Sequence, residues 1–462
     1  MKLTELSAIT PIDGRYSKLV PELQEIFSEY ALIKYRIFVE IEWFIHLSNQ
    51  LNIKELPNLT KQSITFLSKI ERNFNLAEAR KVKNIEKKTN HDVKAVEYYL
   101  RDQFTQSKQL KGLVEFIHFG CTSEDINNIC YALMVKDASK LLISKNINKL
   151  NGLLKKKAHQ YAEIPMVSRT HGQVATPTTV GKEFANFSSR IDRISIVIKE
   201  TSLRGKMNGA VGNYNAHLIA YPKVNWERIS KTFITKVGLL WSPYTTQVEP
   251  KDSMAKLFHG HERLNNVLLD FSKDMWGYIS LNYFLQKTTK GEVGSSTMPH
   301  KVNPIDFENA EGNLGLANTL FHHLSSKITI SRWQRDLSDS TSMRNIGSCF
   351  AYTLIATSSL INGIKKLEVN KESINDDIED AWEVITEAIQ TVMRKHRIDG
   401  GYEVMKKASR GKKVTKKDLH SIIKSLDIPA TEKRKLLDLT PCLLYTSPSP
   451  RDATLSRMPS SA

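Results

Sequence analysis

Apolar residues at helical spacing run through the middle of the chain. One run advances in steps of four and three residues, which is typical of a long helix with a coiled-coil-like seam: Val180, Phe184, Phe187, Ile191, Ile194 and Ile198. Thr176 and Pro177 precede this run, and we expect them to begin the helix, because threonine caps helices and proline suits their first turn.

Two further runs predict long helices. The first, over residues 252–284, places these side chains on one face: Leu264, Leu268, Phe271, Met275 and Ile279. The second follows Asn303 and Pro304 and aligns Phe307, Ala310, Leu314, Ala317, Phe321 and Leu324. Long helices with apolar stripes need partners, so we expect an all-α fold whose central bundle is extended by assembly into a homo-oligomer.

The pattern divides the chain into three helical domains and a tail. Residues 1–111 predict short helices with polar connections at 48–57 and 84–90. Residues 112–364 form the central long-helix domain, and residues 365–441, acidic and then basic, form a smaller helical domain. Residues 442–462 are rich in serine and proline without apolar periodicity, so we expect a disordered tail or a sequence foreign to the folded protein.

Charge and cysteine content exclude several function classes. Lysine and arginine number 66 against 49 acidic residues, a net charge of +17, but the densest basic stretch lacks the interleaved aromatic residues that stack on bases. This argues against nucleic acid as the main partner. The four cysteines are scattered, so neither a disulfide framework nor a zinc site is expected. The N-terminus has no apolar signal core and no stretch is apolar enough for a membrane span, so we expect a cytoplasmic protein without membrane contact.

The segment richest in candidate catalytic and binding residues spans residues 291–304, with the sequence GEVGSSTMPHKVNP. Glycines and hydroxyl side chains here lead into the start of a long helix. Lys301 and Asn303 can donate hydrogen bonds to a carboxylate there, where the helix dipole is positive. Such a run can also be a simple polar connection between two helices, but its ordered combination of residue types favours a site.

This run resembles the signature of the fumarase/aspartase superfamily, whose members eliminate fumarate from succinyl compounds. Six other segments are similar to adenylosuccinate lyases of the bacterial type and lie in that family's order: DGRY at 13–16, TNHDVKAVEY at 89–98, EFIHFGCTSEDINN at 115–128, SRTHGQVATPTTVGKE at 168–183, NGAVGNYNAH at 208–217 and SRWQRDLSDSTSMRN at 331–345. The chain departs from the family pattern after Pro441, where a short apolar helical segment is expected.

The resemblance implies a carbon–nitrogen lyase of the amidine-lyase type. It releases fumarate from adenylosuccinate, giving AMP, and from succinylaminoimidazole carboxamide ribotide, giving AICAR, in purine nucleotide biosynthesis. This β-elimination needs a base, an acid and donors for the charge that builds on a carboxylate, but no metal and no organic cofactor. By resemblance Ser295 is the general base and His171 the general acid, with Glu308 in support of His171.

The resemblance also implies a set of substrate-binding residues. His91 and its neighbours orient the succinyl or phosphate group, Thr122 and Ser123 can both cap a helix and bind carboxylate, and arginines hold phosphate through their two-pronged donors. The full set is Arg15, Tyr16, Asn90, His91, Asp92, Thr122, Ser123, Gln247, Ser296, Lys301, Asn303, Asn309, Arg335, Ser340, Thr341 and Arg344. The family forms homotetramers in which each active site draws residues from three chains.

Two other functions remain open from the sequence. One is another fumarate-releasing lyase of the superfamily, such as argininosuccinate lyase or fumarase. The segments at 13–16 and 331–345 argue against it, because a substrate without phosphate would not need their arginines. The other is a non-catalytic nucleic-acid-binding protein on the same scaffold, which the filled catalytic positions argue against.

Overall fold

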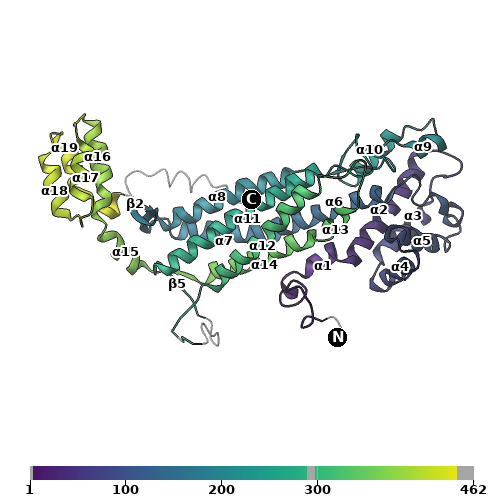
Figure 1. Ribbon diagram of the computed structural model, residues 1–462, viewed down its shortest axis with the longest axis horizontal. Coiled ribbons are helices and arrows are strands. Elements are labelled where there is room, and N and C mark those ends of the chain that lie inside the picture. The colour runs from purple at the N-terminus through teal and green to yellow at the C-terminus, as the bar shows by residue number, and fades with distance from the viewer. Residues whose placement is uncertain (1–3, 289–296, 299, 445–462) are drawn as a thin grey trace. The chain divides into compact units, whose positions relative to one another are not determined.

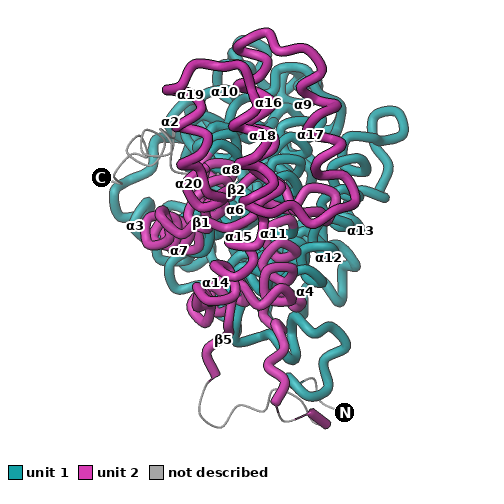
Figure 2. Tube along the Cα trace, turned by 90° about the vertical axis from the view of Figure 1, so that its left-hand side faces the viewer, with its two compact units in different colours: residues 1–147, 193–269, 310–358 teal, residues 148–192, 270–309, 359–462 magenta. Residues whose placement is uncertain are grey.

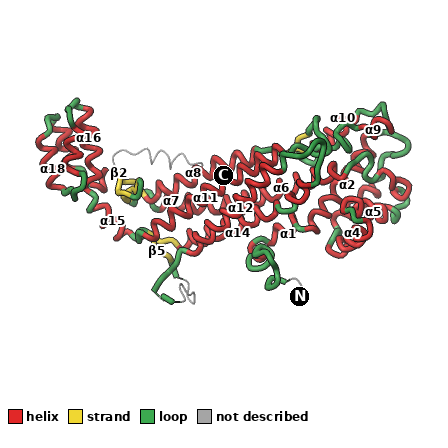
Figure 3. The backbone as a smooth tube through the Cα atoms, in the orientation of Figure 1, coloured by secondary structure: helices red, strands yellow, loops and turns green. Residues whose placement is uncertain are grey.

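Helices make up most of the molecule, which confirms the all-α fold class (Figure 1). The computed structural model describes residues 4–288, 297–298 and 300–444. Strands are short and lie in three two-stranded sheets among the described residues (Figure 3). Within the described part of the chain, no helix combines the length and apolar character that crossing a membrane requires.

The chain divides into two compact units (Figure 2). Unit 1 holds Met1–Ile147, Arg193–Leu269 and Ala310–Ser358, and unit 2 holds Asn148–Asp192, Asp270–Asn309 and Ser359–Ala462. The domain boundaries that the sequence predicts, between residues 111 and 112 and between residues 364 and 365, remain predictions.

Four long helices contribute residues to both units: α8 (Val180–Glu200), α11 (Asp252–Ser280), α12 (Ile305–Lys327) and α14 (Ile346–Lys366). Every member of the apolar stripes predicted for α8 and α12 is buried, so helical spacing identified these faces correctly. The helix predicted to reach residue 284 ends at Ser280 instead, and Phe284 lies in a strand. Asn282 explains the stop, because its φ of +59° is a left-handed conformation that a right-handed helix cannot continue.

Unit 1 contains helices and two very short strands of its own. These are η1 (Ser17–Leu19), α1 (Pro21–Phe27), α2 (Glu29–Gln50), α3 (Lys61–Arg72), α4 (Leu76–Thr89), α5 (Asp92–Phe104), η2 (Leu110–Phe116), α6 (Ser123–Leu141), the π-helical η3 (Leu142–Ile147), β3 (Arg204–Gly205), α9 (Asn215–Ala220), α10 (Trp226–Lys236), β4 (Leu240–Trp241) and α13 (Ser338–Met343).

Two expectations for the N-terminal region are wrong. The first 110 residues include the 22-residue helix α2, and the connection predicted at 84–90 lies almost wholly inside α4. Helix α4 continues through its lysines and asparagine because Val82 is buried on one side while the polar residues face solvent. Asn90, with a φ of +51°, then ends the helix in a left-handed cap.

Unit 2 contains the remaining elements. These are α7 (Asn148–Gln160), β1 (Pro165–Thr170), β2 (Gln173–Thr179), β5 (Phe284–Gln286), β6 (Leu367–Val369), α15 (Lys371–Glu379), η4 (Trp382–Ile385), α16 (Thr386–Lys395), α17 (Gly401–Ser409), α18 (Lys416–Ser425), α19 (Ala430–Asp438) and α20 (Pro441–Leu444).

Two further expectations for unit 2 need correction. Thr176 and Pro177 lie in β2 rather than at a helix start, and Pro177 pairs with Val167 beside a register irregularity, where a missing N–H is tolerated. Thr179 caps α8 instead, since its hydroxyl accepts the N–H of Lys182 at 3.0 Å. Cys442–Leu444, predicted to belong to the tail, lie in α20, and residues 445–462 lie outside the described residues.

Candidate active site

Four charged side chains of unit 1 form what we call the Asp92 cluster: Glu29, Arg36, Asp92 and Arg344. Arg36, whose side chain is only 2% exposed, places its guanidinium 2.7 Å from the Asp92 carboxylate. Arg344 lies 3.3 Å from the same carboxylate and 2.9 Å from Glu29. Burial acts to raise the pKa of Asp92, but the charge and hydrogen bond of Arg36 outweigh it, so the pKa is lowered.

The residues before Asp92 shape the start of α5. His91 is its N-cap, and its ring Nδ1 accepts the N–H of Lys94 at 3.1 Å. Asn90 and His91 are both exposed, whereas Asp92 is half-buried. The segment therefore presents two polar side chains to solvent beside a carboxylate that is held by Arg36.

Thr122 and Ser123 begin helix α6, as predicted. The N–H of Thr122 donates to the Asp125 carboxylate at 2.8 Å. Asp125 is fully buried, and it also accepts the N–H of Asn208 at 2.9 Å and lies 3.1 Å from the ammonium of Lys206. One carboxylate thus joins the helix start to the loop at 208–212, which leads into a pocket.

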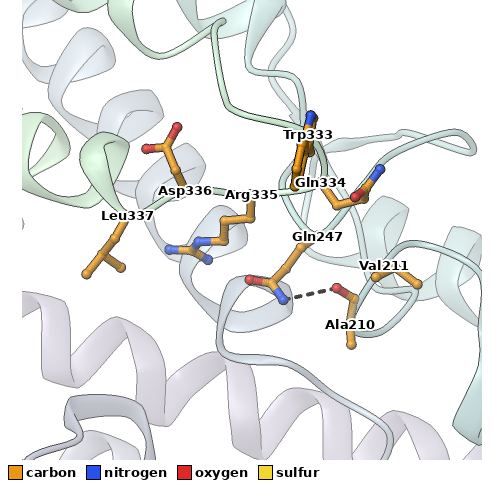
Figure 4. Close-up of a pocket in the computed structure, with 8 residues that line it drawn as sticks. All are labelled: Ala210, Val211, Gln247, Trp333, Gln334, Arg335, Asp336 and Leu337. Atoms are coloured by element: carbon orange, nitrogen blue, oxygen red, sulfur yellow. Dashed lines mark hydrogen bonds between the residues drawn. The ribbon is translucent and has the colours of Figure 1, made fainter.

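That pocket, with a volume of about 430 Å³, is lined by residues of three loops of unit 1 (Figure 4). Its walls are Ala210, Val211, Gln247, Trp333, Gln334, Arg335, Asp336 and Leu337. Gln247 donates to the carbonyl of Ala210 at 3.0 Å. Two residues predicted from the sequence, Gln247 and Arg335, therefore share one cavity although they are far apart along the chain.

Arg335, which lines the pocket, also belongs to a group of charged side chains that we call the Arg335 cluster: Glu124, Lys251, Arg335 and Asp339. The Arg335 guanidinium lies 3.2 Å from Glu124 and donates to the hydroxyl of Ser340 at 3.2 Å. Two predicted binding residues, Ser340 and Arg335, are therefore in contact, while Thr341 is exposed one residue later on α13.

The N-terminal candidates lie on a tight turn of unit 1. Arg15 is exposed and Tyr16 is half-buried. The turn is closed by a hydrogen bond from the N–H of Tyr16 to the carbonyl of Pro11 at 2.8 Å. A side chain at Gly14 would lie 2.8 Å from the carbonyl oxygen of Glu5, so this position favours glycine. Among the described residues, no hydrogen bond or ion pair joins Arg15 to the Asp92 cluster or to the pocket.

In unit 2, His171 lies at the tip of the β1–β2 hairpin, because the segment expected to lead into a helix at Thr176 and Pro177 forms a strand. Thr170 pairs with Gln173, so His171 and Gly172 are the two turn residues, with φ of +53° and +76°. Such two-residue turns require left-handed conformations at both positions. Arg169 anchors the hairpin to α15 by an ion pair of 2.7 Å with Asp377. His171 itself is exposed.

The remaining unit 2 candidates lie at the start of α12. Lys301 is exposed and Asn303 half-buried, just before the helix begins at Ile305. Glu308 accepts the indole N–H of Trp276 at 3.2 Å, and Asn309 accepts the hydroxyl of Ser359 at 2.8 Å. The pairing of Glu308 with His171 remains a prediction. Ser295 and Ser296 lie outside the described residues.

Several residues that support the site were missed in the sequence. Arg36 donates to the predicted residue Asp92 across 56 positions of sequence, and Glu29 accepts from the predicted residue Arg344 across 315 positions. Lys251 donates to Asp339 of the Arg335 cluster across 88 positions. One signal was present, because Arg36 interrupts the apolar run of α2 and an unpaired buried arginine is rarely tolerated. Its partner could not be read from spacing alone. Within residues 4–288, 297–298 and 300–444, no group of three potential metal-binding side chains occurs.

Two family models match this chain. A family model described as "Lyase" matches residues 14–317, and one described as "Adenylosuccinate lyase C-terminal" matches residues 331–445. The chain is 51% identical to an adenylosuccinate lyase of Buchnera aphidicola subsp. Acyrthosiphon pisum, over 96% of this chain and 97% of that relative. It is 50% identical to the adenylosuccinate lyase of Escherichia coli K12 with the same coverage.

Solved structures of lower sequence identity share the fold. A fumarate lyase from Mesorhizobium sp. BNC1 superposes with a TM-score of 0.73 at 17% identity, covering 94% of this chain and 96% of its own. A 3-carboxy-cis,cis-muconate lactonizing enzyme from Pseudomonas putida gives 0.72 at 18% identity, covering 95% and 96%. At such identities the likeness concerns the fold alone.

Proposed function

Because the chain belongs to the adenylosuccinate lyase family of the fumarase/aspartase superfamily, we propose that it eliminates fumarate from adenylosuccinate to give AMP. The same chemistry acts on succinylaminoimidazole carboxamide ribotide, giving AICAR, in purine nucleotide biosynthesis. The observation that carries the proposal is identity near 50% to adenylosuccinate lyases over 96% of the chain. The pocket beside Arg335 supports it, since a guanidinium next to a hydroxyl suits a nucleotide phosphate.

The elimination itself is assigned to residues of unit 2. Ser295 takes a proton from the carbon next to a carboxylate of the succinyl group. The electron pair forms the double bond of fumarate, and the bond to the purine-side nitrogen breaks. His171 protonates that nitrogen as it leaves. Lys301 and Asn303, next to the start of α12, stabilise the charge on the carboxylate, because the N-terminal end of a helix is positive.

We further propose a homotetramer whose active sites combine residues of three chains. The long helices support assembly because they leave large apolar side chains exposed, among them Ile196, Trp276 and Leu316, at 53%, 48% and 52%. The exposed His171 supports it too, because a side chain at a hairpin tip is open to a substrate held by another chain. The cytoplasm suits this enzyme, since the four cysteines are free thiols that a reducing compartment preserves.

An absorbance assay with purified protein tests the activity. Adenylosuccinate should be converted to AMP and fumarate in a reversible reaction, and argininosuccinate should be left unchanged. Protein dialysed against EDTA should keep its activity. Release of fumarate from argininosuccinate alone would assign a different lyase, and activity that only a divalent metal restores would overturn the metal-independent mechanism.

A further inference from the structure

Lys251 has an unusual backbone for a buried lysine. It lies immediately before α11 with a φ of +64°, and only 3% of its surface is exposed. This left-handed conformation is disfavoured for a side chain other than glycine, asparagine or aspartate. The conformation is held locally, because its N–H donates to the buried Glu249 carboxylate at 2.7 Å, and Glu249 also accepts the hydroxyl of Ser242 at 2.9 Å.

The ammonium of Lys251 is directed into the Arg335 cluster. It lies 3.1 Å from Asp339 and 3.9 Å from Glu124, and both carboxylates are buried. Each carboxylate uses its other oxygen for Arg335, with Glu124 at 3.2 Å and Asp339 at 3.9 Å. Two buried anions are therefore shared between two cations, and the formal charge of the cluster is zero.

The net charge of the cluster determines whether the positive charge of Arg335 can attract an anionic ligand. Without Lys251, two buried carboxylates would face a single guanidinium, and the cluster would carry a net negative charge next to the pocket. A phosphate would then be repelled, because charges in a poorly solvated site interact strongly over such distances. Lys251 also holds Asp339, whose other oxygen accepts the N–H of Ser340 at 2.8 Å, the residue whose hydroxyl binds Arg335.

We propose that Lys251 is a positioning residue for phosphate recognition: it neutralises Glu124 and Asp339 so that the charge of Arg335 is available to the nucleotide phosphate. This inference rests on the proposed function, in which Arg335 binds that phosphate. Lys251 shares its carboxylate partners with Arg335 and is not among the residues that line the pocket. Its effect therefore passes through the charge and geometry of the cluster.

Three variants test the role. Lys251→Met should raise the KM for adenylosuccinate by about tenfold or more and change kcat by less than about threefold, because substrate binding is weakened and the chemical groups are untouched. Lys251→Met/Asp339→Asn restores the charge balance and should return KM toward the wild-type value. Asp339→Asn alone leaves one excess positive charge, so inorganic phosphate should inhibit at a lower concentration than in the wild type.

Lys256→Met is the matched control, because this exposed lysine of α11 undergoes the same change of charge. Its KM and its inhibition by phosphate should equal those of the wild type. An unchanged KM in Lys251→Met, or a double variant worse than the single variant, would overturn the proposal. If Lys251→Met does not fold, the Asp339→Asn variant tests the proposal by itself. Weaker inhibition of this variant by inorganic phosphate than of the wild type would then overturn the proposed role of Lys251.

A binding readout separates this inference from the proposed function. Inorganic phosphate and AMP should each raise the melting temperature of the wild type, and should do so less in Lys251→Met at the same concentration. If the wild type releases no fumarate but shows this difference, the proposed function fails and the role of Lys251 stands. If the wild type is active and protection is equal in both proteins, the role of Lys251 fails alone.

Discussion

In unit 1 the charged candidates Asp92, Arg335 and Arg344 lie in networks of neighbouring side chains, whereas in unit 2 several candidates lie exposed at turns and helix starts. Arg335 and Asp92 each contact two or more charged groups. His171 and Lys301, by contrast, are exposed in the segments that carry them. Contacts within unit 1 thus hold these candidate binding residues, while His171, the proposed acid, is exposed to solvent. This difference is expected if the residues that bind the substrate are held in place within one chain, while the catalytic residues of each active site come from more than one chain.

The largest effect should follow from changing the proposed base and acid. Ser295→Ala removes the proton acceptor and His171→Asn removes the leaving-group acid, each lowering kcat by at least about 10²-fold. Asparagine is chosen at position 171 because it tolerates the left-handed turn that His171 adopts. Unchanged circular dichroism and melting temperature would separate lost chemistry from a lost hairpin.

Mixing the two inactive variants tests whether chemistry is completed between chains. Random assembly after co-refolding should create some sites that carry neither change, so activity should partly return. Mixed oligomers that remain inactive after proven subunit exchange would place both residues in the same chain. Sharing of active sites between chains would then no longer explain the contrast between the two units, although the proposed reaction would stand.

A second large effect should appear in the stability of unit 1. Lys206 and Asp125 are completely buried, so Lys206→Met leaves a carboxylate without its ion-pair partner and should lower the free energy of unfolding by about 3–5 kcal/mol. The matched control is Lys413→Met in unit 2, whose ion pair with Asp380 is 71% and 77% exposed and should contribute less than about 1 kcal/mol. Urea unfolding at one fixed protein concentration measures both, and equal losses would contradict the contrast in burial.

A smaller effect, dependent on pH, should arise at His118, whose ring lies 2.6 Å from the buried Glu40 carboxylate. Burial acts to lower the pKa of His118, but the charge of Glu40 outweighs it, so the folded-state pKa is raised. The added stability is therefore fully present below the unfolded pKa of about 6.5 and is lost as pH rises through the higher folded value. The wild type should exceed His118→Gln in stability by more at acidic than at alkaline pH, as measured by urea unfolding. A difference that grows with pH would contradict the assignment.

The sequence predicts the helical part of this molecule better than its connections. The α8 and α12 stripes could be found because burial of one helix face imposes a period of 3.6 residues. The helix start predicted at Thr176 and Pro177 was wrong, because pairing of this segment with β1 outweighed the local preference of these residue types for a helix start. The site shows the same difference between local patterns and long-range contacts. The candidate residues within motifs could be named from the sequence. Arg36 and Lys251 could not, because their partners are distant in sequence and residue spacing does not predict such contacts.

The smallest effect is expected at the C-terminal end. Helix α20 contacts α15, β2 and η4, so the tail segment predicted from Cys442 onward begins inside a packed element of unit 2. The match to the C-terminal family model ends at residue 445. Deleting residues 446–462 should therefore change the melting temperature by less than about 2 °C and leave kcat unchanged.

A deletion that begins at Pro441 provides the contrasting control. It removes the same polar tail together with α20, whose Pro441 is buried, so stability should fall because apolar surface of unit 2 becomes exposed. Differential scanning calorimetry of the two deletions locates the boundary between folded chain and tail. If the shorter deletion lowers the melting temperature as much as the longer one, residues 446–462 pack against the protein, and the segment treated as foreign to the fold belongs to it.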